Sequence, residues 1–125
     1  MKKSLRLQVY NKYSGHCAYC GKKLEYKEMQ VDHIVPQAMS HFLTTEENRK
    51  RADAENIFDI DQAENLNPSC RRCNYYKSCQ SLEEFRERMK DVDWRVADLC
   101  FMNKLAIDYG IITIKPFDGV FYFEK

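Results

Sequence analysis

The sequence predicts a small α+β domain, and three features of the chain lead to this prediction. Apolar residues recur at helical spacing near both ends of the chain, and a short β-branched run lies between them at 29–35. Two C-x-x-C pairs, at 17–20 and 70–73, bracket the middle of the sequence. A length of 125 residues with 44% hydrophobic residues suffices for one packed core, so we expect a single domain over 1–125.

The first elements follow from local patterns. Leucine, valine and tyrosine at helical spacing predict a helix over Ser4–Tyr13, ended by Ser14 and Gly15. The first C-x-x-C pair, followed by glycine, has the form of a zinc knuckle, a tight turn whose glycine relieves steric strain. The apolar run at 29–35 predicts one strand, which Pro36 stops.

The second half of the chain is predicted to be mainly helical. The polar stretch 37–65 is expected to be a long loop with a helical insert, and a helix is expected to begin at Asn74, after the second knuckle. A capping box predicts a helix over Ser81–Lys90, and the 3.6-residue period predicts another over Val92–Tyr109. Ile111–Lys115 and Val120–Phe123 read as a β-hairpin. We expect buried aromatic anchors at Trp94, Phe101, Phe117, Phe121, Tyr122 and Phe123, with stacking of these rings on bases as the alternative.

Charge is unevenly distributed along the chain although the net charge is only +1. Residues 1–30 hold seven basic side chains against Glu25 and Glu28, and two further basic clusters lie at 49–51 and around Arg71 and Arg72. A basic face with an acidic back is compatible with phosphate binding, although a solvated surface of mixed charge explains the pattern equally well.

The chain also carries signals about its compartment. It begins in polar, charged sequence without the apolar run of a signal peptide, and no stretch approaches the ~18 apolar residues that span a bilayer. We therefore expect reduced thiols, a cytoplasmic location and no membrane partner.

The paired cysteines favour a structural Zn²⁺ site made by Cys17, Cys20, Cys70 and Cys73. The alternatives are two disulfides, a redox C-x-x-C motif or an iron–sulfur cluster. Disulfides need an oxidising compartment, and a redox motif does not need a second pair. Cys79 and Cys100 are left over as buried small hydrophobes or free thiols.

Asp32 and His33 are candidate catalytic residues at the end of the predicted strand. A neutral imidazole suits a general base near pH 7, and carboxylate and amide oxygens suit a hard cation such as Mg²⁺ or Mn²⁺. A lone histidine at a strand end is more often structural. Adjacent strand residues also point to opposite faces, so the strand must bend or end here if both serve one site.

In combination and in this order, four segments resemble the HNH endonucleases, whose core is the ββα-metal fold. They are C-A-Y-C at 17–20, V-D-H-I-V-P at 31–36, E-N-L-N-P-S-C at 64–70 and C-N-Y-Y-K at 73–77. The resemblance covers about residues 5–90, and it leaves 91–125 as a C-terminal extension. It implies an α+β fold with an HNH core, zinc knuckles, an N-terminal helix and C-terminal helices.

The resemblance also implies roles for individual residues. His33 would be the general base for phosphodiester hydrolysis, and Asp32 and Asn74 would bind one catalytic divalent metal. Asn65 would pin the long loop so that a backbone carbonyl orients the imidazole of His33. The expected products carry 5′-phosphate and 3′-hydroxyl ends. Lys77, with Arg71 and Arg72, is expected to contact phosphates.

The chain departs from the family pattern at its last motif residue, which is often His but is Asn74 here, so the metal preference is open. His41 lies in the loop, and His16, beside the first cysteine, is rejected as a zinc ligand.

The sequence therefore predicts a DNA endonuclease, a nickase or a cutter, acting on double-stranded DNA as a monomer or homodimer, of a kind frequent in bacteria and phages. The alternatives are a zinc-dependent nucleic-acid-binding module that does not cut, and a structural domain.

Overall fold

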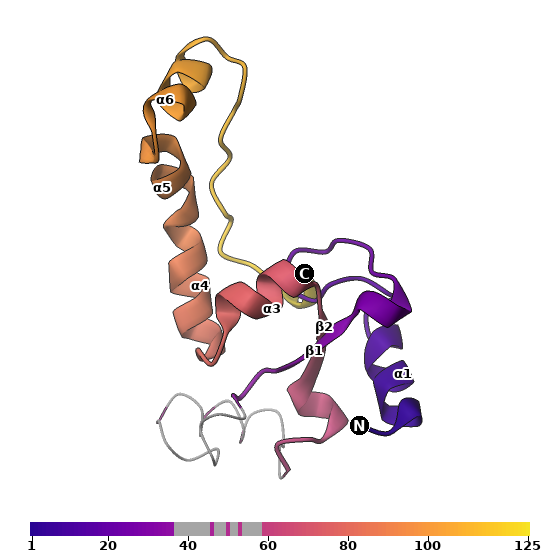
Figure 1. The fold of residues 1–125 in the computed structure, drawn as a ribbon. Coiled ribbons are helices and arrows are strands. Elements are labelled where there is room, and N and C mark those ends of the chain that lie inside the picture. Colours follow the sequence, from indigo (N-terminus) through magenta and orange to yellow (C-terminus); the bar gives the residue numbers. More distant parts are fainter. Residues whose placement is uncertain (37–45, 47–49, 51–52, 54–58) are drawn as a thin grey trace. The chain divides into compact units, whose positions relative to one another are not determined.

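The computed structural model of the chain describes residues 1–36, 46, 50, 53 and 59–125. Contacts divide it into two compact units, residues 1–82 with 121–125 (unit 1) and residues 83–120 (unit 2). The architecture of the described residues is α+β: several helices accompany a small two-stranded antiparallel sheet (Figure 1). Among the described residues, no helix is long and apolar enough to cross a membrane. The expected loop insert and His41 lie outside the described residues.

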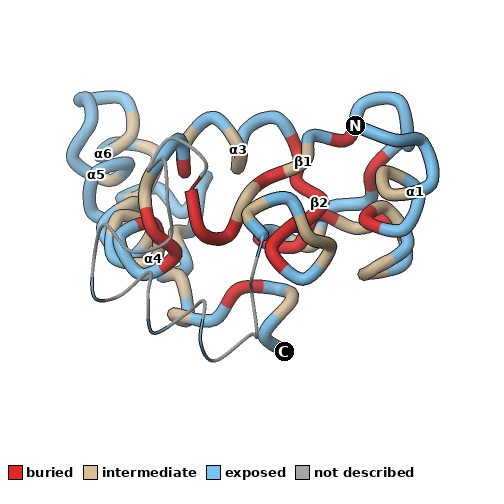
Figure 2. Tube along the Cα trace, turned by 90° about the horizontal axis from the view of Figure 1, so that it is seen from below, coloured by how far each residue is buried: buried red, intermediate tan, exposed pale blue. Residues whose placement is uncertain are grey.

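Unit 1 is built around a two-stranded sheet. β1 (Gln30–His33) pairs with β2 (Leu66–Ser69), with His33 opposite Leu66 and Asp32 opposite Asn67. The helix α1 (Lys3–Asn11) and the short 3₁₀ turns η1 (Tyr26–Glu28) and η3 (Ala63–Asn65) accompany this sheet. Every residue of β2 is buried (Figure 2), whereas in β1 only Asp32 is buried. The core of unit 1 therefore lies around the strand end that carries the candidate catalytic residues.

The helix α3 (Arg71–Lys77) follows β2 directly and brings the second cysteine pair and Asn74 to the sheet. It begins three residues earlier than expected, because the second knuckle is itself the first helical turn. Cys70 is the N-cap, and its sulfur accepts a hydrogen bond from the backbone N–H of Cys73 at 3.4 Å. β1, β2 and α3 thus follow one another in the order strand, strand, helix.

Unit 2 contains most of α4 (Leu82–Lys90) together with α5 (Val92–Asp98) and α6 (Phe101–Asp108). The single helix expected over 92–109 is wrong, because Cys100 adopts an extended conformation and separates α5 from α6. Both helices lie fully within the described range and contain no buried residue. Trp94 and Phe101 are 56% and 74% exposed, so their prediction as buried anchors is also wrong.

The predicted C-terminal β-hairpin is wrong as well. Residues 113–118 have no regular structure, and the chain ends in the 3₁₀ turn η4 (Tyr122–Glu124). The backbone N–H groups of Tyr122 and Phe123 donate instead to the carbonyls of Tyr19 and Ala18, at 3.1 and 2.7 Å. Phe121 is buried as predicted and packs edge-on against the ring of Tyr19. The last five residues therefore dock on the first knuckle, and the N–H groups of Tyr122 and Phe123 are bonded there and not to a hairpin partner.

Candidate functional site

Two tight turns present the four paired cysteines to one another. In the first knuckle the N–H of Gly21 donates to the carbonyl of Cys17, and Gly21 has a left-handed φ of 79°. In the second, Cys70 caps α3 and Cys73 lies in its first turn. Each pair is local in sequence, and the fold of unit 1 brings the two pairs together.

The four ligand sulfurs, of Cys17, Cys20, Cys70 and Cys73, all lie within 4.8 Å of one another. The sulfurs of Cys20 and Cys70 are 3.9 Å apart, nearly twice a disulfide bond of about 2.05 Å. Zinc–sulfur bonds of about 2.3 Å place tetrahedral sulfurs roughly 3.8 Å apart, so this spacing fits a four-coordinate ion. All six cysteines are unbridged, and the four in the cluster could hold a structural metal ion.

The electrostatics of the cluster also favour a cation. Hydrogen bonds from the thiols of Cys20 and Cys73 hold the pKa of Cys17 well below its ordinary value. The same interaction raises the pKa of Cys73. One thiolate is therefore stabilised by neighbouring thiols, and a bound cation would favour the thiolate form of all four. His16 lies outside the cluster, with its Nδ1 3.1 Å from the carbonyl oxygen of Tyr13.

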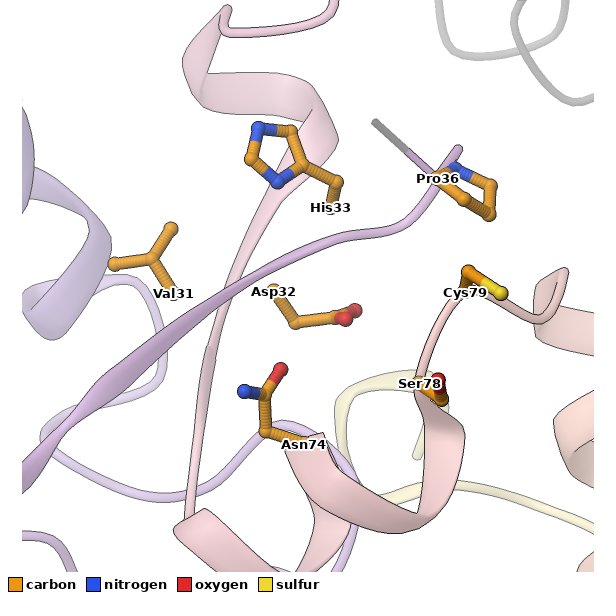
Figure 3. Close-up of a pocket in the computed structure, with 7 residues that line it drawn as sticks. All are labelled: Val31, Asp32, His33, Pro36, Asn74, Ser78 and Cys79. Atoms are coloured by element: carbon orange, nitrogen blue, oxygen red, sulfur yellow. The ribbon is translucent and has the colours of Figure 1, made fainter. Parts of the chain in front are cut away.

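A second feature of unit 1 is a cavity of about 170 Å³ at the end of β1. Three of the four predicted catalytic residues line it, namely Asp32, His33 and Asn74. Figure 3 shows Asp32 and Asn74 facing each other, with the imidazole of His33 across the strand in that view. The remaining lining residues are Val31, Pro36, Ser78 and Cys79.

Asp32 is buried and both of its carboxylate oxygens have partners. The hydroxyl of Tyr19 donates to Oδ2, and the ammonium of Lys77 donates to Oδ1 at 3.2 Å. Burial raises the pKa of the Asp32 carboxyl, and the charge of Lys77 opposes that rise. Donor chemistry at the cavity suits a hard divalent cation, since a carboxylate has lone pairs beyond the two in use and Asn74 offers an amide oxygen.

Lys77 lies in a different place from the one expected for a phosphate contact. Its side chain is fully buried, and its ammonium also donates to the backbone carbonyl of His33 at 2.9 Å. Its position one turn after Asn74 on α3 directs it toward β1 and not toward solvent. We therefore correct its assignment from a DNA contact to an internal cation of the site. Arg71 and Arg72, in the first turn of α3, are exposed as a phosphate contact requires.

His33 is held by a side chain that the sequence did not single out. Its Nε2 lies 2.8 Å from Oδ1 of Asp61, where a backbone carbonyl was the expected partner. Asp61 lies 28 positions after His33 in the sequence. No local pattern could have indicated this pairing.

Asn65 lies outside the cavity and is fully buried. Its Oδ1 accepts from the N–H of Val35 at 2.8 Å, and its Nδ2 donates to the carbonyls of Val35 and Ile60 at 3.2 and 2.8 Å. These bonds join the chain leaving β1 to the chain approaching β2. Asn65 thus occupies a clamping position next to the segment that carries Asp61.

We compared the chain with known protein families, with curated proteins and with solved structures, and none of the three comparisons found a match.

Proposed function

We propose that this protein is a metal-dependent endonuclease of the HNH type that hydrolyses phosphodiester bonds of double-stranded DNA. The observation that carries the proposal is that Asp32, His33 and Asn74 line the same cavity. These are the residues to which the motif resemblance assigns catalysis, and they come from segments 41 residues apart in sequence (74 − 33). The strand, strand, helix order of β1, β2 and α3 is compatible with a ββα core.

In this proposal each residue has a distinct role. His33 is the general base that takes a proton from the attacking water. Asp32 and Asn74 would hold one divalent cation such as Mg²⁺ or Mn²⁺, which when bound supplies positive charge against the phosphate. Asn65 keeps the segment around Ile60 against β1 through its three hydrogen bonds.

The four-cysteine cluster would hold a structural Zn²⁺ ion in this proposal. Its sulfur spacing and its all-thiolate donor set suit zinc, and no position is left open for substrate. The ion would join the first knuckle to the start of α3 and so fix the helix that carries Asn74. DNA would be contacted by the exposed Arg71 and Arg72 on that helix, with the chain acting as a monomer or homodimer.

The test is a plasmid nicking assay with Mg²⁺, Mn²⁺ or Ni²⁺, in which the wild type is compared with His33→Ala and Asn74→Ala. We expect His33→Ala to lose activity by on the order of 100-fold or more, because general-base catalysis contributes that much. Asn74→Ala should need more divalent metal while its zinc content is unchanged. The matched control is Asn11→Ala, an exposed asparagine at the end of α1.

The second candidate is a nucleic-acid-binding zinc module that does not cut. One observation favours it: both oxygens of Asp32 already have partners, Tyr19 and Lys77. A wild-type protein that binds DNA but never nicks it with any of the three metals would establish the binding module and overturn the nuclease.

A further inference from the structure

We propose that Asp61 is a positioning residue for His33, and that the two form a carboxylate–imidazole pair that serves the general base. This inference rests on the proposed function for its role in cleavage, but not for its geometry. The contact joins Nε2 of His33 to Oδ1 of Asp61 at 2.8 Å. Nothing in the motif resemblance assigns a role to Asp61.

The turn that carries Asp61 is held by several hydrogen bonds. The N–H of Asp61 donates to Oδ1 of Asp59 at 2.9 Å, and the N–H of Asp59 donates to Oε1 of Gln62 at 2.9 Å. The N–H of Gln62 closes the turn on the carbonyl of Asp59 at 3.0 Å. The buried Asn65 anchors the turn through the carbonyl of Ile60. Asp61 is 59% exposed, yet its backbone is fixed on both sides.

The chemistry of the pair determines the tautomer of His33. An ionised carboxylate only accepts hydrogen bonds, so the contact requires the proton to lie on Nε2. Nδ1 then keeps its lone pair, and no described residue is bonded to it. Asp61 therefore selects the imidazole form in which Nδ1 is the basic atom, and it limits rotation of the ring.

The same carboxylate stabilises the product of proton transfer. When Nδ1 takes a proton from water, the electron pair of the broken O–H bond stays on oxygen, which attacks phosphorus. The P–O3′ bond breaks with its electrons on the 3′-oxygen, which takes a proton from solvent. His33 is left as an imidazolium, whose positive charge lies 2.8 Å from the Asp61 oxygen.

The carboxylate of Asp61 is exposed, and an ion pair with an exposed partner is ordinarily a weak contributor to stability. The role we assign to Asp61 is therefore orientation and charge, with little effect on folding. A purely structural role would instead appear as a loss of stability on removal of the carboxylate. This difference makes the two roles separable by experiment.

The first experiment is independent of nuclease activity. Ring ¹⁵N chemical shifts of His33 are measured at one fixed pH in the full-length, zinc-loaded protein, as wild type, Asp61→Ala and Asp61→Glu. We expect the wild type to show mainly the Nε2–H tautomer, Asp61→Ala to show a mixture and Asp61→Glu to restore part of the preference. Identical shifts in wild type and Asp61→Ala would overturn the pair, whether or not the protein cuts DNA.

The second experiment measures how much the Asp61–His33 pair contributes to cleavage, by comparing the nicking kinetics of the same variants. Carboxylate partners of metal-bound histidines typically contribute about 10-fold to 100-fold, and by analogy we expect Asp61→Ala to lower kcat by that factor with KM and melting temperature unchanged. Glu28→Gln, which removes an exposed carboxylate elsewhere in unit 1, is the control and should match the wild type. An active Asp61→Ala variant with wild-type kcat would overturn the catalytic role. Inactivity of the wild type itself would instead refute the nuclease, and the tautomer measurement would still decide the pair.

Discussion

At the scale of single residues, the unusual feature of this protein is a buried ammonium group beside the candidate cation site. Lys77 is fully buried, and its charge is matched by Asp32, which also accepts from Tyr19. A buried pair of this kind adds little net stability, but removal of one partner leaves the other charge uncompensated. Lys77 also bonds the carbonyl of His33, so it joins both candidate catalytic positions of β1.

We expect Lys77→Met to destabilise unit 1 by about 3 to 5 kcal/mol, because Asp32 would remain buried without its countercharge. Methionine keeps most of the apolar volume of the lysine stem, so the change mainly removes charge. Arg71→Met on the same helix is the control, and as an exposed substitution it should change stability by no more than about 0.5 kcal/mol. Chemical unfolding of both variants measures the difference. Equal effects of the two substitutions would mean that the Lys77–Asp32 pair does not hold the site together.

The sequence predicted some members of the site and missed others for a physical reason. Asp32, His33 and Asn74 lie in short motifs next to a strand end and a knuckle, so their local spacing carried information. Their hydrogen-bond partners are Tyr19, Lys77 and Asp61. Each partner lies 13 to 45 positions away in the sequence, so only the folded structure identifies it. Such pairing depends on how the chain folds back, and it leaves no periodic signal.

At the scale of elements, the first knuckle and the C-terminal turn form one packed structure. Gly21 has a left-handed backbone, and a Cβ there would lie 2.7 Å from the ring of Tyr122 in η4. The expected hairpin failed for the same reason, since the N–H groups of η4 bond the knuckle. The β-branched and aromatic residues at 120–123 favour a strand, but this composition does not indicate which segment the strand would pair with.

We predict that Gly21→Ala destabilises unit 1 and speeds release of a metal ion held by the four-cysteine cluster. Alanine at positive φ costs about 1 to 2 kcal/mol, and the clash with Tyr122 adds roughly 1 kcal/mol or more. The matched control is Gly110→Ala, where φ is 70° but nothing lies within 4 Å of the added carbon, so it carries the strain without the clash. Metal release is followed with a colorimetric chelator.

A double-mutant cycle with Tyr122→Ala isolates the clash between Gly21→Ala and Tyr122. In the Tyr122→Ala background, Gly21→Ala should destabilise unit 1 less. The stability regained should equal the extra loss that Gly21→Ala shows over Gly110→Ala in the wild-type background. If Gly21→Ala releases metal no faster than Gly110→Ala, then η4 does not support the knuckle.

At the scale of the whole molecule, the four-cysteine cluster is the connection between distant parts of the chain. It joins a turn near the N-terminus to the start of α3, and the last five residues pack on that turn. The sequence predicted this cluster because C-x-x-C spacing is a local signal. No local signal indicated that α5 and α6 contain no buried residue. Periodic apolar residues predict a helical face, and they do not say whether that face is covered.

The cluster leads to a prediction about metal and folding. Purified protein should contain about one zinc ion per chain, and its removal should unfold unit 1, because binding of a structural zinc contributes on the order of 10 kcal/mol, comparable to the stability of a whole domain. We therefore expect Cys73→Ser, or treatment with a strong chelator, to collapse the dispersion of backbone amide signals from unit 1. Cys100→Ser, at an exposed unbridged cysteine of unit 2, should keep both the metal and the dispersion. Readdition of Zn²⁺ to the chelated wild type should restore the spectrum. A metal-free protein that keeps its native spectrum would show that the cluster does not hold the fold together, and the proposed coupling between zinc and Asn74 would then be wrong.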